Sequence, residues 1–143
     1  MVGAKGYEAY LPLYRVRRRW SDRVVDKELP LFPGYLFCRF DPSQRLPILA
    51  APGVVSIISS GKIPIPIPQM EIAAIRAAIE SGFLVMPCAY LKEGQRVRVR
   101  EGPLEGMEGI LTRKKNELRI VLSVEMLQRS VSMEIDRESV IPI

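Results

Sequence analysis

The chain has 143 residues, of which 48% are hydrophobic and 26% charged, a composition typical of one medium or two small globular domains. It contains no histidine, so a His-based catalytic triad and a zinc site of Cys and His ligands are both excluded. Its two cysteines, Cys38 and Cys88, are too few for a disulfide framework and are interpreted as buried, inert thiols. No catalytic group, metal site or cofactor is predicted.

Nothing in the sequence predicts a membrane protein or a secreted one. No apolar stretch approaches the roughly 20 residues that a membrane helix needs. Residues 1–6 lack the apolar core of a signal peptide. We therefore expect the chain in the cytoplasm.

The net charge of +5 is concentrated in the N-terminal part of the chain. Residues 1–88 carry 11 Lys/Arg and 7 Asp/Glu, whereas residues 89–143 carry 10 and 9. Much of the excess is one cluster of arginines: Arg15, Arg17, Arg18, Arg19 and Arg23. Such a patch favours an anionic partner such as a phosphate backbone, and the alternative is a solvated strand face.

The first third of the chain is predicted to consist of strands joined by tight turns. Tyr7–Trp20 is predicted as a strand, Ser21-Asp22 as a turn and Arg23–Leu29 as the return strand. Pro33-Gly34 predicts a tight turn, and the apolar run Tyr35–Phe40 predicts a strand after it.

Prolines set the pattern of the next segment. Asp41 is predicted to cap a short helix that Pro47 distorts. The dipeptide Pro52-Gly53 predicts a turn, and Val54–Ile58 a β-branched strand. Residues 61–68 alternate apolar residues with proline and therefore predict an extended edge segment.

The clearest helix is predicted over Gln69–Ser81, ended by Gly82. Four of its residues recur at helical spacing and predict a core-facing stripe: Ile72, Ile75, Ala78 and Ile79. The pattern then changes to five short alternating strands with glycine turns, which predicts a small β-barrel. We therefore predict two domains, at 1–88 and 94–143, joined by a linker at 89–93.

The second half resembles a KOW domain, through Gly94, Val97 and Val99 followed by the segment Gly102-Pro103-Leu104-x-Gly106-x-x-Gly109. The first half resembles the N-terminal domain of the NusG family. This second resemblance rests on Gly6-Tyr7-Glu8, the run Leu31–Phe37, the segment Pro52–Val55 and the proline segment before the helix. Together the two resemblances imply an α+β domain with an antiparallel sheet, followed by an SH3-like barrel.

The resemblance also implies how such a protein works. An apolar surface of the N-terminal domain would grip the clamp helices of the RNA polymerase β′ subunit. The matching residues are Phe32, Tyr35, Phe37, Pro52, Val54 and Ile57. Strand alternation places Tyr35 and Phe37 on one face, which is either this contact face or plain core.

The arginine cluster would then contact upstream DNA or nascent RNA through phosphates. Trp20 would stack on an unpaired base or, as the alternative, pack against the sheet. The KOW half would bind a small-subunit ribosomal protein or the termination factor Rho, and its mixed charge permits protein or RNA contact.

The sequence departs from the family pattern at two places, and each departure predicts a structural difference. A strand and a helix of the N-terminal domain have no counterpart before Gly6, so an incomplete sheet is expected. Three explanations stay open: the protein starts upstream of Met1, a dimer or strand swap completes the sheet, or the domain is a degenerate copy. Gln128 replaces the usual hairpin glycine, so a strained or widened turn is expected there.

The predicted function is transcription elongation or antitermination by binding polymerase and suppressing pausing or termination. Trp20-Ser21-Asp22-Arg23 resembles the specialised branch of UpxY, LoaP and RfaH types, which act on selected operons. The alternative is a KOW-centred RNA- or ribosome-associated binding protein that does not engage polymerase. An enzyme is disfavoured because Ser21 and Asp22 lack a base partner and the acids are scattered.

Overall fold

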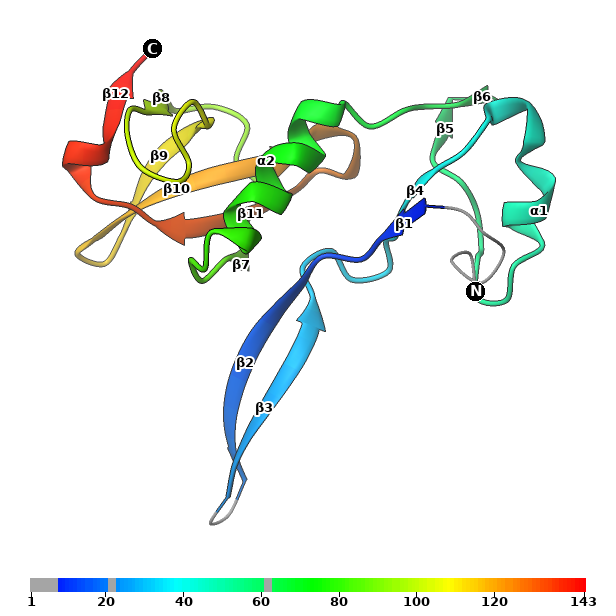
Figure 1. The fold of residues 1–143 in the computed structure, drawn as a ribbon, viewed down its shortest axis with the longest axis horizontal. Helices are drawn as coiled ribbons and strands as arrows, with labels where there is room; N and C mark the ends of the chain where they lie inside the picture. The colour runs from blue at the N-terminus through cyan, green and yellow to red at the C-terminus, as the bar shows by residue number, and fades with distance from the viewer. Residues whose placement is uncertain (1–7, 21–22, 61–62) are drawn as a thin grey trace. The chain divides into compact units, whose positions relative to one another are not determined.

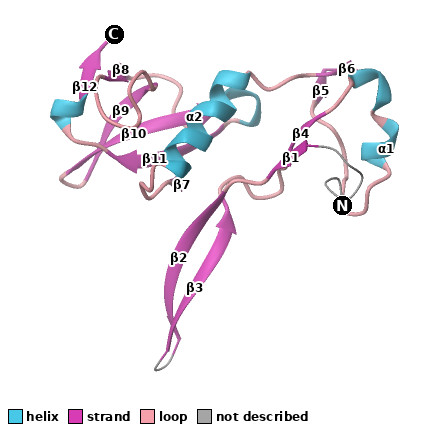
Figure 2. Ribbon diagram, in the orientation of Figure 1, coloured by secondary structure: helices cyan, strands magenta, loops and turns pink. Residues whose placement is uncertain are grey.

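The computed structural model describes residues 8–20, 23–60 and 63–143, and it confirms the predicted α+β class (Figures 1 and 2). The described residues divide into two compact units. Unit 1 contains residues up to 11 together with 34–66, and unit 2 contains residues 12–33 and 67–143. The division into domains at 1–88 and 94–143 stays a prediction.

The small sheet of unit 1 pairs β1, Glu8–Tyr10, with β4, Phe37–Arg39. The strands are antiparallel, with Tyr10 opposite Phe37. The strand predicted over Tyr35–Phe40 is therefore too long, because only three residues of its partner pair with it in the described part of the chain.

The single strand predicted over Tyr7–Trp20 is also wrong, because the chain divides it into β1 and β2, Leu13–Trp20. The break falls at Leu11 and Pro12, and proline has no N–H to donate to a strand ladder. The carbonyl of Pro12 instead accepts a hydrogen bond from the N–H of Leu31 at 2.9 Å.

The proline-shortened helix is confirmed. Asp41 caps a 3₁₀ helix, Pro42–Gln44, by accepting from the Ser43 N–H at 3.0 Å, and α1 follows at Leu46–Leu49. Ile48 and Ala51 form a small buried cluster, against which four half-buried side chains pack: Cys38, Phe40, Val54 and Ile57.

The strand predicted over Val54–Ile58 is wrong, because only Ser59–Ser60 (β5) pairs, with Ile63–Pro64 (β6). The facing segment explains this limit. Pro64 and Pro66 have no N–H, so Ile65 supplies the one further backbone bond, to the carbonyl of Ile58 at 3.0 Å.

The hairpin predicted around Ser21-Asp22 is confirmed in its strands, β2 and β3, Arg23–Pro30. The register places Leu13 opposite Pro30 and Trp20 opposite Arg23, so the ladder spans all eight residues of each strand. The predicted turn itself lies outside the described residues.

Helix α2, Gln69–Glu80, belongs to unit 2 and contacts β10. Its predicted core stripe is confirmed, since Ile75 and Ala78 are buried and Ile72 and Ile79 half-buried. Gly82 follows with φ +87°, the left-handed conformation that commonly ends a helix.

The C-terminal sheet of unit 2 contains the five strands predicted there and one more. In spatial order they are β12 (Val140–Pro142), β8 (Gln95–Val99), β9 (Glu108–Lys114), β10 (Glu117–Val124), β11 (Arg129–Glu134) and β7 (Met86–Cys88). All neighbours are antiparallel. Short 3₁₀ helices, Glu125–Leu127 and Arg137–Ser139, make two of the connections.

Alternation explains the core of this sheet. Val97 and Val99 are buried while Arg96 and Arg98 are exposed, as the period of two in this strand predicts. On β9, Gly109 lies where any side chain would collide, since a Cβ atom would come 2.7 Å from the Val121 carbonyl oxygen. This close approach is the physical reason for the last glycine of the KOW-like motif.

Candidate interaction surfaces

The predicted basic patch lies on the β2–β3 hairpin, but part of its charge is compensated. Arg15 Nη2 is 3.6 Å from Glu28 Oε1, and Arg17 Nε is 3.3 Å from Asp26 Oδ1. Both pairs join residues directly opposite each other in the ladder. They are exposed, so each is weak and readily exchanged for another anion.

The predicted nucleic-acid surface also includes Arg18, Arg19, Trp20 and Arg23. Arg23 is exposed at the start of β3. The side chains of Arg18, Arg19 and Trp20 lie outside the described residues, although the backbone of all three belongs to β2.

The six residues predicted to bind polymerase differ widely in exposure. Phe32 and Phe37 are buried, at 1% and 8% relative exposure, whereas Pro52 is exposed. The other three are half-buried: Tyr35, Val54 and Ile57. Phe32 belongs to unit 2 and the other five to unit 1, so the structure assembles five of them in one compact part.

Five large apolar residues that were not predicted to bind polymerase are exposed in unit 1: Leu11, Leu36, Leu46, Val55 and Ile63. Val55 is 94% exposed, Leu46 75% and Leu36 41%. Alternation offers a signal for Val55, because its neighbour Val54 packs on the Ile48 cluster. No such signal exists for Leu46, since α1 has four residues and is too short for a periodic stripe.

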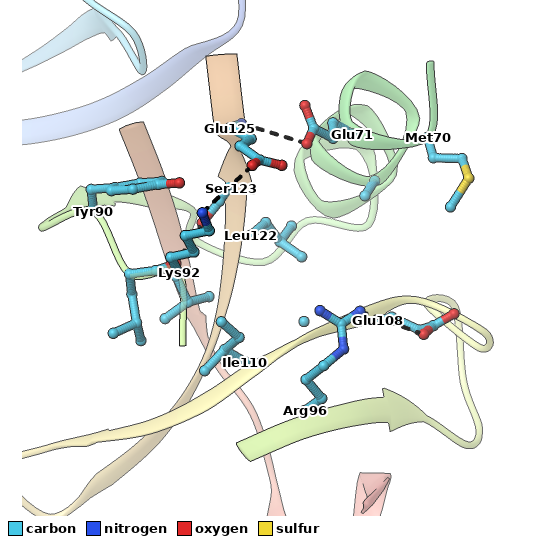
Figure 3. A pocket seen from close by; sticks show the side chains of 14 residues that line it. Met70, Glu71, Tyr90, Lys92, Arg96, Glu108, Ile110, Leu122, Ser123 and Glu125 are labelled. Carbon is cyan, nitrogen blue, oxygen red and sulfur yellow. Dashed lines mark hydrogen bonds and ion pairs between the residues drawn. The ribbon is translucent and has the colours of Figure 1, made fainter. Parts of the chain in front are cut away.

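Helix α2 and the C-terminal sheet enclose a solvent-open cavity of about 300 Å³ (Figure 3). Glu71 enters it from α2, and its Oε2 accepts the Glu125 N–H at 3.5 Å while Oε1 is buried without a hydrogen-bond partner. Burial is the main cause that raises the pKa of Glu71, and the nearby Glu125 carboxylate adds to it. Lys92 Nζ forms an ion pair with Glu125 Oε1 at 3.9 Å.

The cysteines do not form a reactive site. Both are free and half-buried, and burial raises the pKa of each thiol, which disfavours the nucleophilic thiolate. At Cys88, a hydrogen bond with Ser132 and the charges of Arg119 and Lys114 oppose the effect of burial in part.

Among the described residues, no helix has both the length and the apolar character needed to cross a membrane. The same part of the chain gathers no three Cys, Asp or Glu side chains in a way that would hold a metal ion. Its chemically distinctive features are surfaces: a basic hairpin, exposed apolar residues and a small antiparallel sheet. The chain is a small protein of mixed α+β class with these surface features.

Comparison with known proteins identifies the class further. The family described as "Transcription termination factor nusG" matches residues 2–76, which is 75 of the 143 residues. The chain belongs to the NusG family. This confirms the family resemblance, and the specialised branch within it stays a prediction.

Individual relatives extend the likeness beyond the N-terminal half. The transcription termination/antitermination protein NusG of Borreliella burgdorferi is 24% identical over 137 residues, covering 87% of this chain and 74% of the relative. The protein of the same name from Neisseria meningitidis is 28% identical over 134 residues, covering 88% and 74%. That from Helicobacter pylori J99 is 26% identical over 126 residues, covering 86% and 70%.

Proposed function

We propose that this chain is a transcription elongation and antitermination factor that binds the β′ clamp helices of RNA polymerase and suppresses pausing or termination, working by contact and not by catalysis. The observation that carries the proposal is the family match over residues 2–76, supported by relatives named for termination and antitermination. Its place of action is then the cytoplasm. Action on selected operons is the finer part of the proposal, supported by Trp20-Ser21-Asp22-Arg23.

Unit 1 is the proposed polymerase-binding part. Phe37, the first residue of β4, is buried, and Val54 and Ile57 pack against the buried cluster of Ile48 and Ala51. Tyr35 and Pro52 then provide accessible contact area on this support. An aromatic ring on a supported segment buries a large area at small entropic cost, which suits a helix docking against it.

The β2–β3 hairpin is the proposed contact for upstream DNA or nascent RNA. Its eight-residue ladder gives the arginines a fixed spacing, and phosphate contacts from such groups position a protein without reading sequence. Because the pairs of Arg15 and Arg17 are exposed, phosphates can replace the carboxylates at small cost.

The test is capture of bacterial core RNA polymerase by the purified chain. We expect wild type to bind and Tyr35→Ala/Pro52→Ser to lose at least about tenfold in affinity, which corresponds to ~1.4 kcal/mol. Phe83→Ala, an exposed aromatic of unit 2, is the matched control and should bind as wild type does. A folded wild type that fails to bind core polymerase would sink the proposal.

The second candidate is an RNA- or ribosome-associated protein centred on the KOW-like half. It is favoured by the size of the C-terminal sheet, which has six strands, whereas each of the two sheets described in unit 1 has two. A small-subunit ribosomal protein or Rho would be its protein partner. Absence of polymerase binding together with retained RNA binding would move this candidate to the front.

A dimer or strand swap stays a prediction of the sequence analysis. The sheet of unit 1 pairs β1 with β4 alone in the described residues, which supports pairing with a further strand. Sedimentation of the purified chain over a range of concentrations distinguishes monomer from dimer directly.

A further inference from the structure

The turn between β9 and β10 carries three consecutive cations. Lys114 lies opposite Glu117 in the ladder, so Lys115 and Asn116 form a two-residue turn. Lys115 has φ +57°. Two-residue hairpin turns require a positive φ at their first residue, because this conformation matches the right-handed twist of the two strands. Arg113, Lys114 and Lys115 are all exposed, so the hairpin holds three cationic side chains at a defined tip.

The charge of this tip is not compensated within the described chain. Residues 113–119 contain four Lys/Arg and one acid, Glu117, a balance of +3. Glu117 Oε2 lies 3.4 Å from Arg119 Nη1, and Arg119 is only 12% exposed, held also by its Nε bond to Ser132 Oγ at 2.9 Å. No described carboxylate comes within 4.0 Å of the three tip cations.

Other described cations behave differently. Arg96 and Arg98 share Glu108, each at 3.8 Å, and Lys92 pairs with Glu125 at 3.9 Å. These three cations of unit 2 each have a carboxylate within 4.0 Å, whereas the three cations of the tip have none among the described residues.

The surroundings of the tip decide which anionic partner fits. Protein interfaces place an apolar centre inside a polar rim. Of the large apolar side chains that are exposed in the described chain, none lies on β9, on β10 or in the turn that joins them. A phosphate backbone needs no apolar centre, since its contacts are electrostatic and depend on displaced counterions.

We propose that the β9–β10 turn of the C-terminal sheet is a second nucleic-acid contact, in which Arg113, Lys114 and Lys115 bind backbone phosphates. The contact does not depend on polymerase binding by unit 1. It is sequence-blind, and it adds an anchor on the KOW-like half to the hairpin contact of β2–β3.

The experiment measures binding of the full chain to a fluorescein-labelled single-stranded RNA and to a duplex DNA of equal length. The salt concentration is varied from about 50 to 200 mM, because affinity that depends on phosphate contacts falls steeply over this range. The variant is Arg113→Gln/Lys114→Gln/Lys115→Asn, in which asparagine tolerates the left-handed backbone. The matched control, Lys92→Gln/Arg96→Gln/Arg98→Gln, removes the same charge from ion-paired positions.

We expect at least about tenfold weaker binding by the turn variant at low salt, with a salt slope reduced by about 2 for RNA, from ~0.7 per lost phosphate contact. The control should change affinity less than twofold. A preference for RNA or for duplex DNA identifies the natural source of the phosphates.

Two results would overturn the proposal. One is unchanged affinity in a turn variant that melts as wild type does, and the other is an equal loss in the control, which would indicate net charge alone. Binding to polyglutamate is measured in the same way. If the turn variant keeps its affinity for nucleic acid but loses affinity for polyglutamate, the partner of the turn is an acidic protein. Lys114→Gln alone serves as a milder variant and should remove about a third of the slope change, because one of three contacts is lost.

Discussion

Arg17 lies opposite Asp26 on the β2–β3 hairpin, with its Nε atom 3.3 Å from the carboxylate Oδ1. Arg15 and Glu28 repeat this arrangement two residues along, at 3.6 Å. The two acids therefore compete with phosphate for the arginines that the sequence marks as a nucleic-acid surface.

Removing this competition should strengthen nucleic-acid binding. We expect Asp26→Asn/Glu28→Gln to raise affinity for duplex DNA or RNA by about 3–10-fold at low salt, because two more cations become available to phosphates. Stability should change by less than about 1 kcal/mol, since both pairs are exposed. Fluorescence anisotropy provides the measurement. Glu101→Gln/Glu105→Gln, an equal charge change at exposed acids, is the control, and an equal gain there would contradict a local effect.

The contact of α2 with the C-terminal sheet should depend on pH through Glu71. Its pKa is raised in the folded chain, mainly by burial, so the folded state holds the proton more tightly than the unfolded state. The free energy of unfolding should therefore fall as pH rises from about 4.5, the ordinary value, through the raised pKa. Below this window the carboxyl is neutral in both states and the penalty disappears.

Glu71→Gln tests this assignment. It keeps an acceptor for the Glu125 N–H and removes the buried charge, so it should raise the melting temperature by about 1–3 °C at pH 7.5 and flatten its pH dependence. Thermal melts of wild type and variant at pH 4.5 and 7.5 give the difference. Glu80→Gln, at an exposed position of the same helix, should leave the pH profile of wild type in place. A variant less stable than wild type at pH 7.5 would refute the burial penalty.

Gln128 should be an easily improved position. It ends the 3₁₀ helix before β11 in the left-handed conformation, φ 51° and ψ 48°, as expected from glutamine in a glycine position. An L-residue pays roughly 1–2 kcal/mol there, so Gln128→Gly should stabilise the chain by up to about 1 kcal/mol after the added entropy of glycine in the unfolded state. Urea unfolding measures the gain. Gln128→Ala retains a Cβ atom and should give none, and a loss with glycine would contradict the strain.

Gly109 should tolerate no side chain. A Cβ atom at this position would lie 2.7 Å from both the Val121 carbonyl oxygen and Ile120 Cγ1. We expect Gly109→Ala to lower the free energy of unfolding by about 2–3 kcal/mol, in the range of overpacked cores. In an Ile120→Ala background, which lacks Cγ1, Gly109→Ala should still be destabilising, because the clash with the Val121 carbonyl oxygen remains. If Gly109→Ala had no cost in that background, the Ile120 side chain alone would set the limit.

Local chemistry was sufficient for the features that a few neighbouring residues decide. Pro33-Gly34 and Pro52-Gly53 each place glycine at positive φ, +85° and +88°, because proline fixes one turn residue and glycine alone takes the next without strain. The stripe of α2 and the alternation of β8 follow from helical and strand periods. The unusual backbone at Gln128 was predictable because a glycine is missing from a familiar pattern.

Tertiary structure alone decided the features that depend on distant partners. A strand extends only as far as its neighbour offers hydrogen-bond groups, so Pro12 ended β1 and Pro66 limited the pairing of Val54–Ile58 to one backbone bond, from Ile65 to Ile58. The compensation of Arg17 required the hairpin register, and the hydrogen bond to Glu71 required the N–H of Glu125, which lies 54 positions later in the chain. The periodicity of the sequence specifies which face of a helix or strand is apolar. Only the folded chain specifies which distant group packs on that face, because such contacts form between residues that share no local sequence pattern.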